Sequence, residues 1–269
     1  MLKDITLGQY FPGNSFVHRL DPRTKILFVI VYITMIFCIK GLAGYAVIAV
    51  FSVLAICSTH IPVKFVLKGL KPIMLFVAIT AVFNLFLTDG RILWSFGILK
   101  ITYEGMMAAI YMVLRIFFLV LGTSLLTLTT SPIALTDGIE QLLSPFKKLG
   151  LPAHEFAMMM TIALRFIPTL LEETDKIVKA QTARGADFES GSLIARAKAM
   201  IPILIPLFIS AFRRADDLAV AMECRCYRGG ESRTRLHTLK LSRVDAFGWV
   251  VITVFAVMIL VTNKLSGRF

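Results

Sequence analysis

The sequence lacks the motifs that most enzymes and ATP-binding proteins carry. None of its 269 residues form a G-x-x-x-x-G-K-[ST] phosphate-binding loop, so the chain is not expected to hold ATP by itself. It has no Ser/His/Asp set typical of nucleophilic catalysis, no His-rich cluster and no paired carboxylates inside a hydrophobic run. These absences argue against an enzyme, including one that works within the membrane. We expect no catalytic residue and no bound cofactor.

Cysteine is also scarce, with four residues in the whole chain. Cys38 and Cys57 fall in hydrophobic runs, whereas Cys224 and Cys226 fall in a segment expected to face the reducing cytoplasm, so a disulfide framework is excluded. The Cys-x-Cys spacing lacks a second pair, and His237 is the only imidazole near it in the sequence. We therefore predict no metal site.

Hydrophobic residues are what the chain has in abundance. They make up 57% of the sequence and cluster in runs, with a mean hydropathy of +0.78. Residues 1–25 have no apolar core, so no cleavable signal peptide is expected. Five runs approach the roughly 20 residues that cross a bilayer: 26–39, 42–58, 72–88, 106–130 and 246–262. The pattern predicts an all-α integral membrane protein with about five transmembrane helices.

The distribution of lysine and arginine predicts how these helices are oriented. With the N-terminus inside, 23 of these residues lie in cytoplasmic segments and five lie outside. We therefore expect a multi-pass protein of the cell membrane whose C-terminus is outside. The net charge of +12 is then explained by topology and by contact with anionic headgroups, and no nucleic-acid partner is required.

The boundaries that follow divide the chain into three parts. Residues 1–130 hold the N-terminal segment and four transmembrane helices, and residues 244–269 hold the last one. Residues 131–243 form an unusually long cytoplasmic segment. Its capping and breaking residues predict helices over 131–152, 153–185 and 192–227.

The two longer cytoplasmic helices have similar ends. A shift of 41 residues aligns "DKIVKAQTARG" (175–185) with "DDLAVAMECRC" (216–226) and places Arg184 on Arg225. The flanking residues are all small: Ala183, Gly185, Cys224 and Cys226. Either arginine is explained as an ordinary helix-end cation that interacts with the macrodipole. Small neighbours on both sides also suit an arginine that enters a groove on a partner and meets carboxylates there.

The first halves of these two helices are apolar. Pro168, Pro202 and Pro206 each remove an intrahelical hydrogen bond and favour a bend, and Met158–Met160 are adaptable packing residues. The simpler interpretation is an ordinary helical core with methionine as filler. Together, the bends and apolar faces favour helices that lie along the membrane surface, apolar toward lipid or a partner.

Arg115 is the one charged residue inside a predicted span. An intramembrane arginine is a functional candidate by default. It is equally explained if the side chain extends to the membrane interface or pairs with a backbone carbonyl.

Four stretches resemble motifs of a known family, and the likeness spans nearly the whole chain. They are "GQYFPGNSFVHRLDPRTKI" (8–26), "LRFIPTLLEE" (164–173), "AQTARGADF" (180–188) and "AMECRCYRGG" (221–230). They are similar to the opening signature, a mid-chain helix and the two Ala-Arg-Gly motifs of the T component (EcfT) of energy-coupling factor (ECF) vitamin importers. Arg184 matches the first motif fully, whereas Cys224 and Cys226 replace the alanine and glycine of the second.

The resemblance implies a non-catalytic transmembrane scaffold of an ABC-type importer. Two ATP-binding subunits on separate chains would each take one helix tip, made of Ala183, Arg184 and Gly185 or of Cys224, Arg225 and Cys226. A membrane-embedded substrate-binding S component would face Pro202, Leu204, Pro206 and Leu207. The alternative function is a self-contained permease, which would need polar residues at mid-membrane and usually repeated halves.

Overall fold

The chain folds into helices that group into two compact units. The computed structural model describes residues 10–39, 41–96, 99–150, 152–188, 190, 192–229, 239 and 241–266. One unit, which we call the bundle, falls within residues 8–139 and 238–269. The other, the helical arm, falls within residues 140–237. Residues 8 and 9 of the N-terminal signature and Gly230 of the second tip motif lie outside the described residues.

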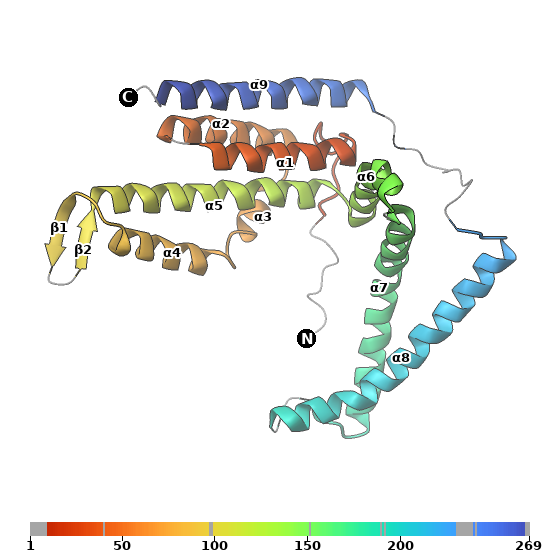
Figure 1. Ribbon diagram of the computed structural model, residues 1–269. Coiled ribbons are helices and arrows are strands. Elements are labelled where there is room, and N and C mark those ends of the chain that lie inside the picture. Colours follow the sequence, from red (N-terminus) through yellow and green to blue (C-terminus); the bar gives the residue numbers. More distant parts are fainter. Residues whose placement is uncertain are drawn as a thin grey trace. The chain divides into compact units, whose positions relative to one another are not determined.

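The bundle has five main helices, which correspond to the five predicted hydrophobic runs (Figure 1). They are α1 (Pro22–Cys38), α2 (Leu42–Thr59), α4 (Met74–Leu87), α5 (Tyr103–Thr129) and α9 (Arg243–Ser266). A short helix, α3 (Val63–Lys68), precedes α4, and α6 (Pro132–Leu143) follows α5. The sequence predictions of an all-α membrane fold and of these helices are therefore confirmed.

The first and last of these helices run parallel and are tied together at both ends. At their first turns the backbone N–H of Asp21 donates to Asp245 Oδ1 at 2.8 Å. At their last turns Asn263 Nδ2 donates to the carbonyl oxygen of Cys38 at 2.7 Å. A contact between residues more than two hundred positions apart thus aligns α9 with α1.

Helices α2 and α5 both run antiparallel to α1. Lys25, in the first turn of α1, donates from Nζ to the carbonyl oxygen of Thr129 in the last turn of α5, at 2.9 Å. These two helices are therefore antiparallel. Helix α2 follows α1 through a short connection and also runs antiparallel to it. We call the end of the bundle where α1 and α9 begin and α2 and α5 finish the proximal end.

A buried carboxylate organises the proximal end. Asp245 is 2% exposed and also accepts from the backbone N–H and the hydroxyl of Ser242, at 2.8 and 2.9 Å. Asp21 caps α1 by accepting from the backbone N–H of Arg23 at 2.9 Å, and its other oxygen forms an ion pair with the Arg23 guanidinium at 3.0 Å. The Asp-Pro pair at 21–22 is a recognisable helix start in the sequence. Its link to Asp245 appears only in the fold.

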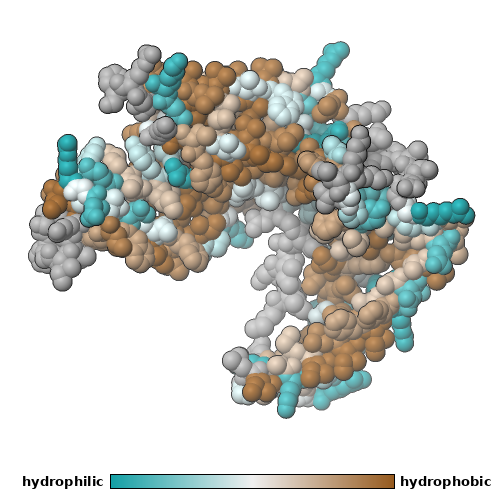
Figure 2. Space-filling model, viewed as in Figure 1, coloured by the Kyte–Doolittle hydropathy of each residue, from teal (hydrophilic) through white to brown (hydrophobic). Residues whose placement is uncertain are grey.

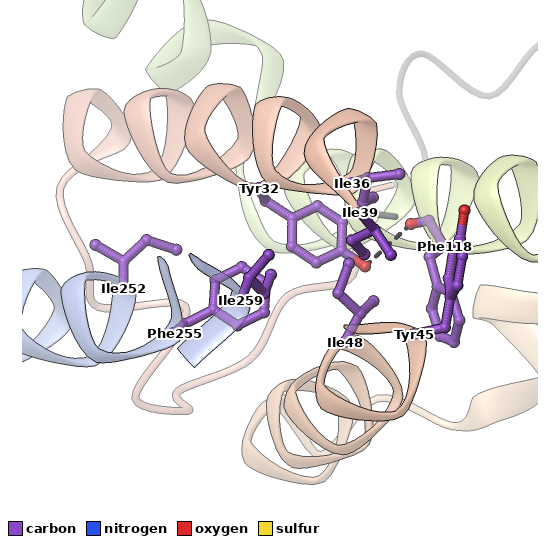
Figure 3. Packing of buried hydrophobic residues seen from close by; sticks show 9 residues of the cluster. All are labelled: Tyr32, Ile36, Ile39, Tyr45, Ile48, Phe118, Ile252, Phe255 and Ile259. Carbon is purple, nitrogen blue, oxygen red and sulfur yellow. Dashed lines mark hydrogen bonds between the residues drawn. The ribbon is translucent and has the colours of Figure 1, made fainter. Parts of the chain in front are cut away.

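The main core of the bundle lies between α1, α2, α5 and α9 (Figure 3). Tyr32 extends into it and uses its hydroxyl twice, donating to the carbonyl oxygen of Phe118 at 3.1 Å and pairing with Ser52 Oγ at 3.0 Å. Gly122 lets α5 approach the Tyr32 ring, because a Cβ there would lie 2.3 Å from it. Nine buried residues form this core: Tyr32, Ile36, Ile39, Tyr45, Ile48, Phe118, Ile252, Phe255 and Ile259.

By length and hydropathy, four described helices can cross a membrane: α2, α5, α9 and residues 194–224 of α8 (Leu193–Cys224). Helices α1 and α4 have 17 and 14 residues and are shorter than the 18 residues taken here as the minimum length. Helix α8 meets it, although the sequence placed α8 on the membrane surface. Apolar side chains cover much of the visible face of the bundle (Figure 2), as expected where lipid replaces water.

A β-hairpin between α4 and α5 was not predicted. Strands β1 (Ile92–Phe96) and β2 (Leu99–Thr102) pair antiparallel, with an irregularity between Ile92 and Trp94. The sequence does carry a signal for it, since β-branched and aromatic residues flank a two-residue connection that begins with glycine. The sequence prediction considered hydrophobic runs of transmembrane length and did not assign these shorter segments.

The helical arm consists mainly of two long helices, α7 (Ala153–Ala183) and α8. The sequence predicted one helix over 131–152, but this stretch divides into α6 and a 3-10 helix, η2 (Ser144–Leu149). Pro145 explains the division, because it cannot donate the hydrogen bond that would continue α6. Both α7 and α8 continue through their internal prolines.

Candidate functional site

The tip of α7 ends in a well-defined hydrogen-bonded turn. Gly185 adopts a left-handed backbone with φ +88°. Its N–H donates to the carbonyl oxygen of Thr182 at 2.9 Å, and the N–H of Ala186 donates to that of Gln181 at 3.0 Å. These two bonds and the left-handed residue define a Schellman motif, in which Arg184 occupies the C-cap position.

The tip of α8 has the same geometry 41 residues later. Cys226 adopts a left-handed backbone with φ 55°. Its N–H donates to the carbonyl oxygen of Glu223 at 2.8 Å, and the N–H of Tyr227 donates to that of Met222 at 3.0 Å. Arg225 is therefore the C-cap residue of a second Schellman motif.

The two tips thus match residue by residue in backbone conformation. The replacement of glycine by Cys226 does not change the turn, although a left-handed backbone costs a residue with a side chain about 1–2 kcal/mol. Around Gly185, an added Cβ would meet nothing within 4 Å. No neighbouring atom of the chain therefore excludes a side chain at position 185. The left-handed backbone favours glycine at this position, and a partner that approached the tip closely would favour it as well.

All six predicted tip residues are exposed. They are Ala183, Arg184, Gly185, Cys224, Arg225 and Cys226, and both cysteines are free thiols. Within the described part of the chain, neither Arg184 nor Arg225 forms an ion pair with an acidic side chain. Each guanidinium is thus presented beyond a helix end between small side chains.

Antiparallel packing of α7 and α8 separates the two tips. Arg214 of α8 pairs with Glu173 of α7 at 2.9 Å, and Gln181 Nε2 of α7 donates to the carbonyl oxygen of Pro202 at 3.4 Å. The first tip therefore lies near residue 202 of α8, and Arg225 lies 23 residues further on. At 1.5 Å per residue this separates the tips by about 35 Å. One small partner surface could not hold both.

Around its two internal prolines, α8 exposes most of one apolar stretch. Pro202, Leu204 and Pro206 are exposed and Leu207 is half-buried, whereas Ile203 is only 7% exposed. Four large side chains continue the exposed face: Ile201, Ile205, Phe208 and Phe212. This face needs lipid or a partner to cover it.

Arg115 lies against an aromatic ring. Its guanidinium carbon is 5.6 Å from the centroid of the Phe37 ring, a cation–π distance. Its Nε atom is buried and has no hydrogen-bond partner among the described residues. Phe37 belongs to the last turn of α1, so Arg115 sits level with the end of the bundle opposite the proximal end. One of the two explanations offered by the sequence was a hydrogen bond to a backbone carbonyl. The Nε atom makes no such bond among the described residues.

Comparison with known proteins agrees with these features over nearly the full length. Residues 13–236 match a family profile described as cobalt transport protein (CbiQ). A protein of Thermosediminibacter oceani, named energy-coupling factor transporter transmembrane protein EcfT, is 56% identical over 268 residues, which cover 100% of this chain and 99% of that protein. The chain belongs to this family of energy-coupling factor transporter transmembrane proteins.

Two further members show the same name and a similar extent. The EcfT protein of Ruminiclostridium cellulolyticum is 57% identical over 255 residues, covering 95% of this chain and 96% of its own. That of Bacillus subtilis is 47% identical over 260 residues, covering 96% and 98%. The resemblance inferred from the motifs is therefore confirmed. As an EcfT family member, the chain is a multi-pass transmembrane component of a transporter.

Proposed function

We propose that this chain couples ATP hydrolysis on two separate subunits to uptake of a vitamin or other micronutrient through an S component. In this scheme Arg184 and Arg225 each enter a groove on one ATP-binding subunit. Pro202, Leu204, Pro206 and Leu207 face the S component. The chain itself carries no cofactor, because ATP is held by its partners. The N-terminus and the helical arm are cytoplasmic, and the C-terminus is outside.

One observation carries this proposal: the two tips share one Schellman geometry with an arginine at the same position. Equivalent tips about 35 Å apart suit two equivalent partners, one for each tip. An arginine fork donates to carboxylates or carbonyls in a groove, and small neighbours let the groove close around it.

The competing explanation is that both arginines only stabilise their own helix ends. That interaction is worth about 0.3–1 kcal/mol and affects stability rather than coupling. By contrast, removing one partner of a buried, hydrogen-bonded charge pair at an interface costs roughly 2–5 kcal/mol. The two explanations therefore predict different phenotypes for the same substitutions.

Uptake and ATPase assays on the reconstituted multi-subunit complex decide between them. We expect Arg184→Ala and Arg225→Ala each to leave the protein folded and to weaken coupling, and the double variant to lower uptake by about 30-fold or more. Arg213→Ala is the matched control, because Arg213 is an exposed arginine of α8 outside the tip. Ala183→Trp and Cys224→Trp should also impair coupling while they keep the charge.

Normal coupling in the double variant, together with silent tryptophan substitutions, would mean that the tips are caps and that the proposal is wrong. Co-purification tests the wider alternative. A scaffold retains nucleotide-binding chains and a second membrane chain, whereas a self-contained permease transports its substrate when purified alone.

A further inference from the structure

The bundle contains a cavity of about 270 Å³ at its proximal end. Its walls come from four helices: α1 supplies Phe28 and Val29, α2 supplies Ala55, α5 supplies Leu125, and α9 supplies Val251. The segment before α1 closes one side with Phe16 and Leu20. We call this space the proximal cavity. One side of this space is open, so it is an apolar pocket in the surface of the bundle that lipid or a ligand is needed to cover.

The lining is apolar, and nearly all of its polar side chains are already engaged. Ser52 pairs with Tyr32 at 3.0 Å, Ser58 donates to the carbonyl oxygen of Leu54 at 2.8 Å, and Thr129 donates to that of Leu125 at 2.7 Å. A sugar, nucleotide or vitamin ring with many polar groups would find few partners here. Most of any occupant must therefore be hydrocarbon.

Lys25 is the exception among the lining residues. It is 6% exposed, and its Nζ donates to the carbonyl oxygens of His18 at 3.2 Å and Thr129 at 2.9 Å. An ammonium has three N–H groups, so one is left without a partner among the described residues. The cavity thus combines hydrocarbon walls with a single cationic donor.

The position of that donor matches the level of lipid headgroups. Lys25 lies in the first turn of α1, whereas Tyr32, which lines the deeper part, lies seven residues further in. This gives the cavity a depth of about 10 Å along the helices. At the rim, the rings of Phe16 and Phe247 meet edge to face with centroids 5.6 Å apart, and both are exposed.

The rim also points to lipid as the source of the occupant. Phe247, Val251 and Leu54 are 59%, 38% and 61% exposed, so the side between α2 and α9 is open to the surroundings of the bundle. Trp249 stands beside Phe28 at a centroid distance of 5.1 Å and is itself partly exposed. Aromatic residues at helix ends mark the membrane interface.

We propose that the proximal cavity binds one acyl chain of a membrane phospholipid, whose phosphate accepts a hydrogen bond from Lys25. The chain enters between α2 and α9 and ends against Tyr32. An apolar cavity of about 150 Å³ already binds a benzene-sized ligand, so this larger one holds a section of an alkyl chain. The bound lipid fills the space between four helices and becomes part of the bundle.

Photolabelling of the full-length protein in detergent tests this proposal. The probe is phosphatidylglycerol with a diazirine in the middle of one acyl chain, and adducts are mapped by mass spectrometry. We expect them on residues 121–129 and 247–252, competed by unlabelled phosphatidylglycerol. A diacylglycerol with the same diazirine chain lacks the phosphate. It should label these residues about ten-fold less, as expected for one lost charge-assisted hydrogen bond.

Two substitutions on α2 provide the matched comparison. Ala55→Phe fills the cavity and should lower labelling about ten-fold, since the phenyl ring occupies the volume of the chain. Val53→Phe adds the same ring at a 58% exposed position outside the lining and should leave labelling unchanged. The thermal midpoint of each variant confirms folding. Equal labelling of Ala55→Phe and Val53→Phe, or equal labelling by diacylglycerol, would overturn the proposal.

Discussion

The bundle and the helical arm are both helical and both apolar, but they bury very different shares of their surface. In an apolar 18-residue stretch of each of α2, α5 and α9, 28% is buried, whereas the corresponding share in α8 is 6%. The bundle has a nine-residue core and several polar ties between distant helices, whereas the arm buries mainly Ala153, Ala157 and Ile203. A helix pair with so little core of its own depends on lipid or partners to cover it. The bundle is an anchor, and the arm is the part suited to contact other chains.

The largest expected effect concerns the side of the membrane on which the arm lies. Cys224 and Cys226 are exposed native thiols at the tip of α8. In a Cys38→Ala, Cys57→Ala background, we expect an impermeant maleimide to label them in inverted vesicles and to leave them unlabelled in intact cells. Labelling from outside would mean that α8 crosses the membrane, as its length allows. The arm would then be part of the membrane domain, and the distinction drawn between the bundle and the helical arm would be wrong.

The second prediction compares equivalent truncations in the two units. Tyr32→Ala removes a 5% exposed ring from the core of the bundle and should lower the free energy of unfolding by about 3–5 kcal/mol. Phe208→Ala removes a 62% exposed ring from α8 and should change it by less than about 0.5 kcal/mol in the isolated chain. Thermal unfolding in detergent measures both. Similar losses for the two variants would show that the arm has a core of its own.

The third prediction concerns the exposed face of α8 in the assembled complex. Leu204 is 43% exposed, so Leu204→Lys should leave the isolated chain folded. If the S component covers this residue, an unpaired charge there costs several kcal/mol, and that subunit should be lost from the purified complex while the ATP-binding subunits stay. Leu204→Met is the control that keeps the apolar contact. Retention of the S component with loss of the ATP-binding subunits would reverse the assignment.

The fourth prediction concerns the two left-handed tip residues. Gly185→Ala places a side chain on a left-handed backbone and should destabilise the tip of α7 by about 1 kcal/mol. Cys226→Gly relieves the same strain at the tip of α8 and should be neutral or slightly stabilising. Amide hydrogen exchange at residues 180–186 and 221–227 reports each turn separately. Faster exchange after Cys226→Gly would contradict the shared geometry.

The smallest effect is expected from the ion pair between α7 and α8. A hydrogen bond with Ser210 and the ion pair with Arg214 lower the pKa of Glu173 from its ordinary value. Because the folded value is lowered, the stabilisation is present at neutral pH and is lost as the pH falls through that value. Glu173→Gln should therefore cost less than about 1 kcal/mol at pH 7, and the difference from the unmodified protein should shrink in acid. A difference that grows in acid would contradict this sign.

Much of the helical arrangement was predictable because hydrophobic runs and helix caps are local signals. The five runs, the Asp-Pro start of α1, the glycine after Arg184 and the 41-residue shift between the tips can all be identified along the chain. The β-hairpin was missed because its strands are too short to stand out as runs of transmembrane length. The break after α6 was missed because the effect of Pro145 on the helix was not considered. Cys226 could not be predicted to be left-handed, since a cysteine does not by itself favour that backbone.

The amino-acid sequence alone determined the family, the membrane character and the two arginine tips, because these rest on composition and on residues close together in the chain. Tertiary structure alone decided which helices meet. It joined Asp21 to Asp245 and Cys38 to Asn263, separated the tips to opposite ends of an antiparallel pair, and left a lysine facing an apolar cavity. The ties within the bundle join residues more than a hundred positions apart, and the contacts between α7 and α8 join residues 21 and 41 positions apart. Nothing in the local sequence specifies the partner.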